Sequence, residues 1–163
     1  MALCYHADDI KNFGWRTVFD PLVTELRSLE KDGLDLEVDG VVSTYKVVLS
    51  CVTGDNLFLN GLLGFVEPFS ADHPCRHCTD HKHDFINIHQ EKPAALRTIE
   101  QYSKAVTDQN VPETGIKANC CLNGLSNFHA STNYVQDLMH DILEGVCSYD
   151  LTLFCKTNKL KEM

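Results

Sequence analysis

The stretch Tyr45-Lys-Val-Val-Leu-Ser-Cys-Val-Thr53, followed by Gly54-Asp55-Asn56, decides the fold that this sequence predicts. The run is apolar on both faces from Val47 to Val52, which is typical of a central strand covered on both sides. An acidic residue follows it, and α/β enzymes often place a catalytic or metal-binding carboxylate just beyond the carboxyl end of such a strand. We therefore expect a strand over 41–53 with Asp55 at its open end.

An alternating pattern just before this run predicts a hairpin. Apolar residues at 34, 36 and 38 alternate with acidic residues, which is the period of a strand covered on one face. Asp39-Gly40 then supplies a two-residue turn signal. The sequence therefore predicts that a strand over 34–38 pairs with the strand over 41–53.

Helical patterns flank these strands. Asp20-Pro21 is typical of a helix start and Gly33 of a helix end, so we expect a helix over 21–31. Other helical patterns cover 57–65, 93–106 and 134–154, and residues 3–5 can form a short strand. The order predicts an α/β fold in three parts: a core over 1–70, a Cys- and His-rich segment with a long loop over 71–133, and a helical segment over 134–163.

Composition restricts the possible partners and compartment. The 163 residues carry a formal net charge of −9, whereas a free-standing nucleic-acid binder usually has a basic surface, so we expect weak or no DNA binding. No apolar run is long enough to cross a membrane, and the first residues lack a secretory pattern. The eight cysteines are therefore expected to be reduced, in the nucleus or cytoplasm.

Asp55 allows two interpretations. As a carboxylate after an inner strand, it is a candidate ligand for Mg²⁺, which prefers oxygen atoms. As the residue before an apolar helix, it is also suited to cap that helix, since Gly-Asp-Asn is good turn and cap chemistry. A two-metal nuclease site needs several converging carboxylates, so Asp55 by itself is insufficient.

The pair Cys75-x-x-Cys78 is the strongest metal-binding signal in the chain. Two cysteines at this spacing can bind one ion from a tight knuckle, and structural zinc sites take four ligands in a tetrahedron. The sequence therefore predicts a zinc site that holds Cys75 and Cys78.

The remaining zinc ligands have several candidates. His81 and His83 follow closely and could complete a compact site. His140 is the alternative, because Glu144 lies one helical turn later on the same helix face. His129 is a further candidate for the fourth position.

Several motifs together resemble a known family. They are Gly54-Asp55-Asn56-Leu57, Leu63-Gly-Phe-Val-Glu67, Phe69-Ser-Ala71, Cys75-Arg76-x-Cys78 and Asp137-Leu-Met-His140-Asp-Ile-Leu-Glu-Gly-Val-Cys147. In combination, over Leu3 to about Leu153, they are similar to transposase-derived proteins of animal genomes, in the CACTA-like group of DDE transposases.

The resemblance implies an RNase H-like core in which three acidic residues hold two metal ions. By this resemblance Asp55 is the second catalytic aspartate, Cys75 and Cys78 are the zinc cysteines, and His140 is the distant zinc ligand. In a partial core, the strand over 3–5 would be the third strand and the strand over 41–53 the fourth. The strand over 34–38 belongs to the same partial core. The first and third catalytic carboxylates would lie before Met1 and beyond Met163.

The expected function follows from the two catalytic carboxylates of the family that this sequence would lack. We expect a transposase-derived middle fragment that is catalytically inactive, keeps one aspartate of the triad and binds structural zinc. One alternative is a DNA transposase or nuclease that becomes active with Mg²⁺ when other segments complete it. Another is a zinc-stabilised interaction or regulatory module. The expected partners are a second copy of the chain or a longer transposase-like protein.

Overall fold

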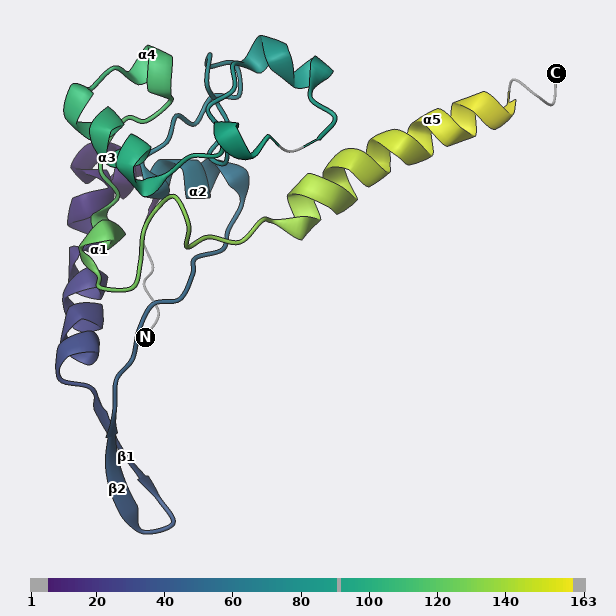
Figure 1. The fold of residues 1–163 in the computed structure, drawn as a ribbon. Coiled ribbons are helices and arrows are strands. Elements are labelled where there is room, and N and C mark those ends of the chain that lie inside the picture. The colour runs from purple at the N-terminus through teal and green to yellow at the C-terminus, as the bar shows by residue number, and fades with distance from the viewer. Residues whose placement is uncertain (1–5, 91, 160–163) are drawn as a thin grey trace.

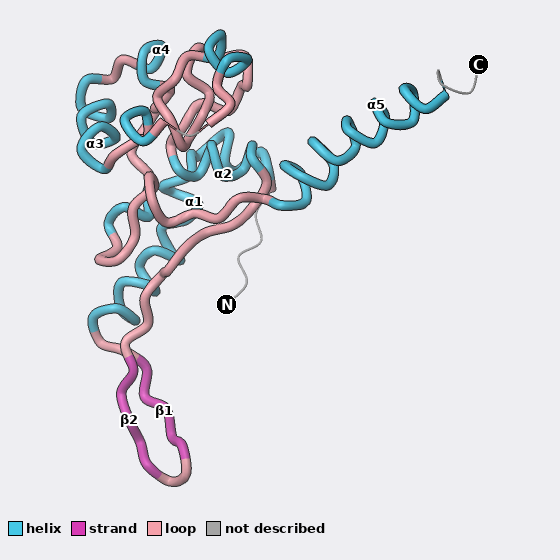
Figure 2. The backbone as a smooth tube through the Cα atoms, turned by 45° about the vertical axis from the view of Figure 1, so that its right-hand side comes forward, coloured by secondary structure: helices cyan, strands magenta, loops and turns pink. Residues whose placement is uncertain are grey.

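The computed structural model describes residues 6–90 and 92–159, which form a mixed helical and β structure (Figures 1 and 2). The expected strand over 3–5 lies outside the described residues. The principal elements, in chain order, are α1 (Ala7–Lys31), β1 (Leu34–Val38), β2 (Val41–Tyr45), α2 (Asn56–Leu63), α3 (Ile99–Asp108), α4 (Val111–Thr114) and α5 (Cys147–Lys159). Short 3₁₀ turns form η1 (Lys82–Asn87), η2 (Pro93–Ala95) and η3 (Cys121–Gly124), and a π-helical segment forms η4 (Met139–Val146).

Helix α1 is longer than the predicted helix over 21–31. It begins at Ala7, kinks at Gly14, where φ is 77°, and continues through Pro21. The expected start at Asp20-Pro21 is therefore wrong. Proline removes one backbone donor from a helix, and here the burial of Phe19 and Val23 against the core offsets that loss.

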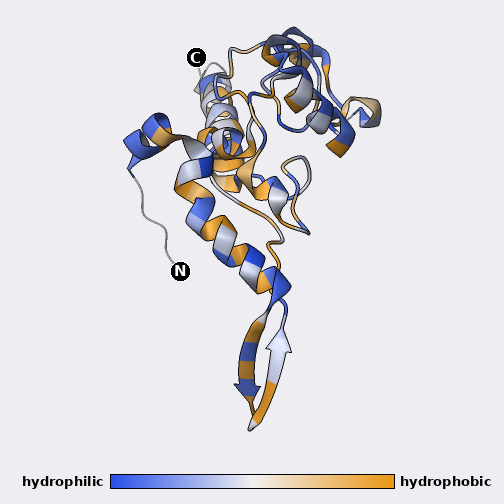
Figure 3. Ribbon diagram, turned by 90° about the vertical axis from the view of Figure 1, so that its left-hand side faces the viewer, coloured by the Kyte–Doolittle hydropathy of each residue, from blue (hydrophilic) through white to orange (hydrophobic). Residues whose placement is uncertain are grey.

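The predicted hairpin is confirmed. Strands β1 and β2 pair antiparallel, with Leu34 opposite Tyr45 and Val38 opposite Val41. Asp39 and Gly40 both have positive φ, 53° and 75°, as a tight two-residue hairpin turn requires. The hairpin projects from the end of α1 away from the other helices, and hydrophilic and hydrophobic residues alternate along β1 in Figure 3.

The expected strand over 41–53 is wrong beyond Tyr45. In the described part of the chain the sheet has two strands, and the next segment forms a single isolated β-bridge, parallel, between Val52 and Tyr134. An apolar run becomes a central strand only when other strands flank both of its edges, and β2 pairs with β1 alone. The larger RNase H-like core is therefore not confirmed by the described residues.

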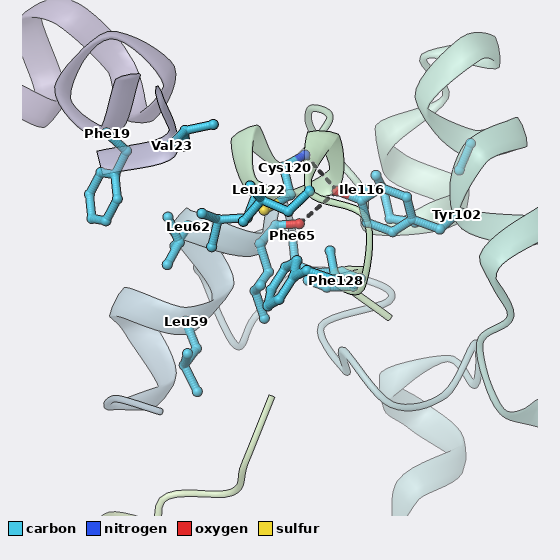
Figure 4. Close-up of a cluster of buried hydrophobic side chains, with 14 residues drawn as sticks. Phe19, Val23, Leu59, Leu62, Phe65, Tyr102, Ile116, Cys120, Leu122 and Phe128 are labelled. Atoms are coloured by element: carbon cyan, nitrogen blue, oxygen red, sulfur yellow. Dashed lines mark hydrogen bonds between the residues drawn. The ribbon is translucent and has the colours of Figure 1, made fainter. Parts of the chain in front are cut away.

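The core is built around α2, whose bounds agree closely with the predicted apolar helix over 57–65. Asp55 caps its start, and Gly64 ends it with a φ of 84°. The buried cluster in Figure 4 joins α1, α2, α3 and the segment around η3. Its most enclosed large side chains are Tyr102, Phe65, Leu59, Leu63 and Leu122.

The other two predicted helices differ from expectation: the first is divided, and the second begins later and continues to Lys159. The pattern over 93–106 divides into η2 and α3, because Thr98 and Gln101 form a capping box that starts a new helix at Ile99. The long loop expected over 107–133 contains the short helices α4 and η3. Residues 134–137 are not helical, and η4 and α5 then run away from the body of the protein (Figure 1).

Candidate metal centre

Cys75 and Cys78 form a tight knuckle. The Sγ atom of Cys75 accepts hydrogen bonds from the backbone N–H groups of His77 and Cys78, each at 3.3 Å. A sulfur atom that accepts two amide N–H groups is favoured as a thiolate, because hydrogen bonds to a charged group stabilise that charge. The local backbone therefore suits a metal-bound thiolate at Cys75.

A short antiparallel contact holds this knuckle in place. Thr79 donates its N–H to the carbonyl of Ala95, and Arg97 donates its N–H to the carbonyl of His77, both at 2.8 Å. Cys78 lies opposite Leu96 between these two bonds. The segment just before α3 therefore fixes the backbone on which both thiols sit.

Arg97 places a buried positive charge beside the knuckle. Its Nε–H donates to the carbonyl oxygen of Cys75 at 2.9 Å, and its guanidinium lies over the ring of Phe65. Burial lowers the pKa of Arg97, whereas the neighbouring thiols Cys75 and Cys78 act to raise it. The Arg97 side chain therefore joins the backbone of the knuckle to the core.

Cys78 resists ionisation in this surrounding. Burial, with a smaller contribution from the neighbouring Cys75, raises the pKa of Cys78 to about 12. A divalent cation reverses this balance, since a coordinated thiol is deprotonated. A cavity of about 340 Å³ opens beside both cysteines, and Asp80 lines it together with apolar side chains such as Ile88.

Polar contacts also join the knuckle to the segment that precedes His140. The ring Nδ1 of His77 lies 2.7 Å from the hydroxyl of Tyr134, and that hydroxyl also donates to the carbonyl of Arg76. The side chain of Gln136 contacts both His77 and Arg76. The zinc-type motif and the residues just before His140 are thus one connected polar network.

His140 itself faces an acidic pair. Its Nδ1 bonds to the carboxylate of Asp137, and its Nε2 lies 4.0 Å from Glu144. Asp137, through this bond, raises the pKa of the exposed His140 above its ordinary value, and Glu144 and Asp55 add smaller effects. The structure therefore brings His140 and Glu144 together, as their helical spacing predicts, at the start of η4.

His81 and His83 belong to a separate histidine cluster. Their rings stack at 4.9 Å, and His81 also meets His73 edge to face. The Nδ1 atom of His81 accepts the backbone N–H of His83, and its Nε2 lies 3.6 Å from Asp72. These contacts hold the rings of His81 and His83 against each other and place His81 beside Asp72.

His129 lies against the core. Its ring meets Tyr102 edge to face, and its Nδ1 accepts the backbone N–H of Ser131. Burial lowers its pKa below the ordinary value of 6.5. This environment is that of a neutral, partly buried histidine.

Asp55 is a helix cap. Its Oδ1 accepts the backbone N–H of Phe58 at 2.8 Å, which satisfies a free donor in the first turn of α2. The neighbouring Asn56 donates its amide to the carboxylate of Asp141. The start of α2 therefore meets the acidic start of η4, although the sequence separates them by 85 residues.

The structure brings together only part of the predicted zinc site. Cys75 and Cys78 are adjacent, whereas across residues 6–90 and 92–159 no three His, Cys, Asp or Glu side chains form a group that could hold a metal ion. Sequence reasoning missed the role of Arg97, for which the local pattern carries no signal. It also missed Tyr134 and Gln136, whose only signal is that they precede the Met-His motif.

Within the described ranges, no helix has both the length and the apolar character needed to cross a bilayer. Comparisons of the chain with protein-family models, curated proteins and solved structures found no match.

Proposed function

We propose that this chain is a transposase-derived protein that binds one structural zinc ion through Cys75 and Cys78 and does not itself cleave DNA. The observation that carries the zinc proposal is the pair of N–H bonds to the Cys75 sulfur. When bound, the ion would supply a cross-link between this knuckle and its remaining ligands. His140, with Glu144, is the proposed distant pair, because the network around Tyr134 joins its segment to the knuckle.

Metal analysis tests the zinc proposal directly. The purified protein should contain about one zinc per chain, since a structural site binds a single ion. Cys75→Ser should lose the metal, whereas the matched variant Cys51→Ser, at an exposed cysteine, should keep it. Equal metal content in Cys75→Ser and the parent protein would overturn the proposal. His140→Ala should weaken zinc retention during dialysis, and unchanged retention would remove His140 from the ligand set.

The capping role of Asp55 supports the absence of cleavage by this chain. Its carboxylate already bonds to the first turn of α2, and in-line cleavage with Mg²⁺ needs several carboxylates around two ions. Incubation with a DNA substrate and Mg²⁺ or Mn²⁺ should therefore give no product. Cleavage that disappears in Asp55→Asn would contradict the proposal, because asparagine preserves the helix cap while it removes the charge.

A second candidate function is an interaction or regulatory module in the nucleus or cytoplasm. It is favoured by large apolar side chains that are exposed on one face of the hairpin and along η4 and α5, including Leu36, Val41, Met139, Leu143, Val146 and Phe154. Exposed apolar surfaces of this extent commonly mark protein contacts. The proposed partner is a second copy of the chain or a longer transposase-like protein, and co-purification of such a partner would test this function.

A further inference from the structure

A polar cavity of about 390 Å³ lies between α3 and α4. One wall is a face of α3, on which Gln101, Lys104 and Asp108 follow one another at helical spacing. The opposite wall is the end of α4, with Glu113 and Thr114. Cys75 and Cys78 are not among the residues that line this cavity, so it is separate from the candidate metal centre.

Arg97 also lines the cavity, and one of its donors is buried without a partner. The side chain is only 8% exposed, and its Nε–H already donates to the carbonyl of Cys75. Within the described residues, its terminal nitrogen Nη2 has no hydrogen-bond partner. A Cβ atom added at Gly115 would lie 3.3 Å from Nη2, so the guanidinium reaches the segment directly after Thr114. Because buried donors are almost always paired in native proteins, this nitrogen indicates that an acceptor binds here.

The polar groups around the cavity are sorted by charge. Towards the start of α3, Arg97, Gln101 and Lys104 supply N–H donors. The amide oxygen of Gln101 accepts a backbone N–H in the capping box, so its NH₂ group is the part that can donate to a ligand. Towards the end of α3, Asp108 and Glu113 supply carboxylates. Lys104 and Asp108 are four residues apart, which is about 6 Å along a helix axis.

We propose that this cavity binds a small zwitterion, an amino acid whose carboxylate and ammonium groups lie about one helical turn apart. The ligand carboxylate accepts hydrogen bonds from Arg97 and Lys104, and a guanidinium is well suited to this because its N–H groups match a carboxylate. The ligand ammonium donates to Asp108 and Glu113. A simple anion would be repelled by these two carboxylates, and a simple cation by Arg97 and Lys104. Because Nη2 itself is enclosed, binding requires a small shift of the exposed side chains that line the cavity.

An NMR titration of the full-length protein with γ-aminobutyrate tests this inference. Saturable shifts at millimolar concentration are expected for the backbone amides of Gln101 and Lys104 and for the Nε–H of Arg97. Butyrate and propylamine each carry only one of the two charges, so each should bind about tenfold more weakly, because it loses the charged hydrogen bonds at one end. Equal binding of either single-charge compound, or the absence of saturable shifts with γ-aminobutyrate, would overturn the proposal.

Two pairs of charge variants locate the ligand. Lys104→Gln and Glu113→Gln each remove an exposed charge at one end of the cavity, and each should weaken γ-aminobutyrate binding about tenfold. Lys11→Gln and Glu37→Gln remove the same charges at exposed positions on α1 and β1, beyond the cavity, and should leave binding unchanged. Unchanged affinity in Lys104→Gln or in Glu113→Gln would contradict the proposed site. Zinc content is expected to be the same in all four variants, so the outcome is independent of the metal proposal.

Discussion

The guanidinium of Arg97 donates a hydrogen bond from Nε to the carbonyl oxygen of Cys75 at 2.9 Å. Arg97 is only 8% exposed, and it also packs over the ring of Phe65. A buried cation therefore ties the backbone of the cysteine knuckle to the hydrophobic core. Removal of a buried hydrogen-bonded charge commonly destabilises a protein, because its partners lose a charged donor.

Arg97→Met should lower the free energy of unfolding by about 1.5–3 kcal/mol, the usual worth of a hydrogen bond to a charged group. Urea unfolding provides the measurement. Lys104→Met, at an exposed position on α3, removes the same charge without a core contact and should change stability by about 0.5 kcal/mol or less. Equal stability of the two variants would show that Arg97 does not anchor the knuckle.

Tyr102→Phe should also destabilise the fold. The Tyr102 hydroxyl donates to the carbonyl of Leu63 at 2.7 Å and accepts the N–H of Cys120 at 3.0 Å. Its loss leaves buried backbone groups unpaired, which costs about 1–3 kcal/mol. Thermal or urea unfolding should show this loss, whereas Tyr45→Phe on the exposed hairpin should not. Identical unfolding curves for the two variants would contradict the role assigned to this hydroxyl.

His129 should make the protein sensitive to mild acid. Burial holds its pKa below 6.5, and protonation would break the bond that its Nδ1 accepts from Ser131. A lowered folded-state pKa adds stability above the unfolded value of about 6.5, and this stability is lost as the pH falls through the folded value. An NMR titration should therefore give His129 a pKa below 6.5.

A matched pair of variants isolates this effect. His129→Asn keeps an acceptor near Nδ1 but does not titrate, so it should reduce the fall in melting temperature between pH 7 and pH 5. His89→Gln, at an exposed histidine, should leave that fall unchanged. A His129 pKa at or above 6.5 would contradict the assigned burial.

The hairpin should promote self-association. On one face Leu34, Leu36 and Val38 lie exposed, and an isolated two-stranded hairpin is only marginally stable in water. Leu36→Lys should shift the protein toward monomer in size-exclusion chromatography with light scattering. Val42→Lys places the same charge on the opposite face, since Val42 pairs with Glu37, and should leave association unchanged. A monomeric parent protein at all concentrations would contradict this prediction.

Local sequence signals predicted the local structure well. Asp39-Gly40 supplied the positive φ angles of the hairpin turn, and the apolar pattern over 57–65 located α2, although Gly64 ended that helix before the pattern ended. The capping interpretation of Asp55 is likewise confirmed by its bond to Phe58. Each of these features depends on interactions within a few residues, which is why the sequence pattern was sufficient.

Features that depend on distant contacts were not predictable in this way. The run over 46–53 has the composition of a buried strand, but its pairing requires neighbouring strands, and in the described structure its one β-bridge joins Val52 to Tyr134. The contact between Asn56 and Asp141, and the position of Arg97 next to Cys75, join segments that no local pattern connects. Fold class was therefore predicted at the level of mixed helix and strand, and metal binding by Cys75 and Cys78 stays a prediction.

X-ray absorption at the zinc edge of the purified protein tests the central claim most directly. Two sulfur ligands at about 2.3 Å are expected, with nitrogen or oxygen ligands at about 2.0–2.1 Å. Cys75→Ser should remove the zinc or lower the sulfur count, and Cys51→Ser should reproduce the parent spectrum. A protein without zinc, or zinc without sulfur ligands, would contradict the assignment of Cys75 and Cys78 as its metal centre.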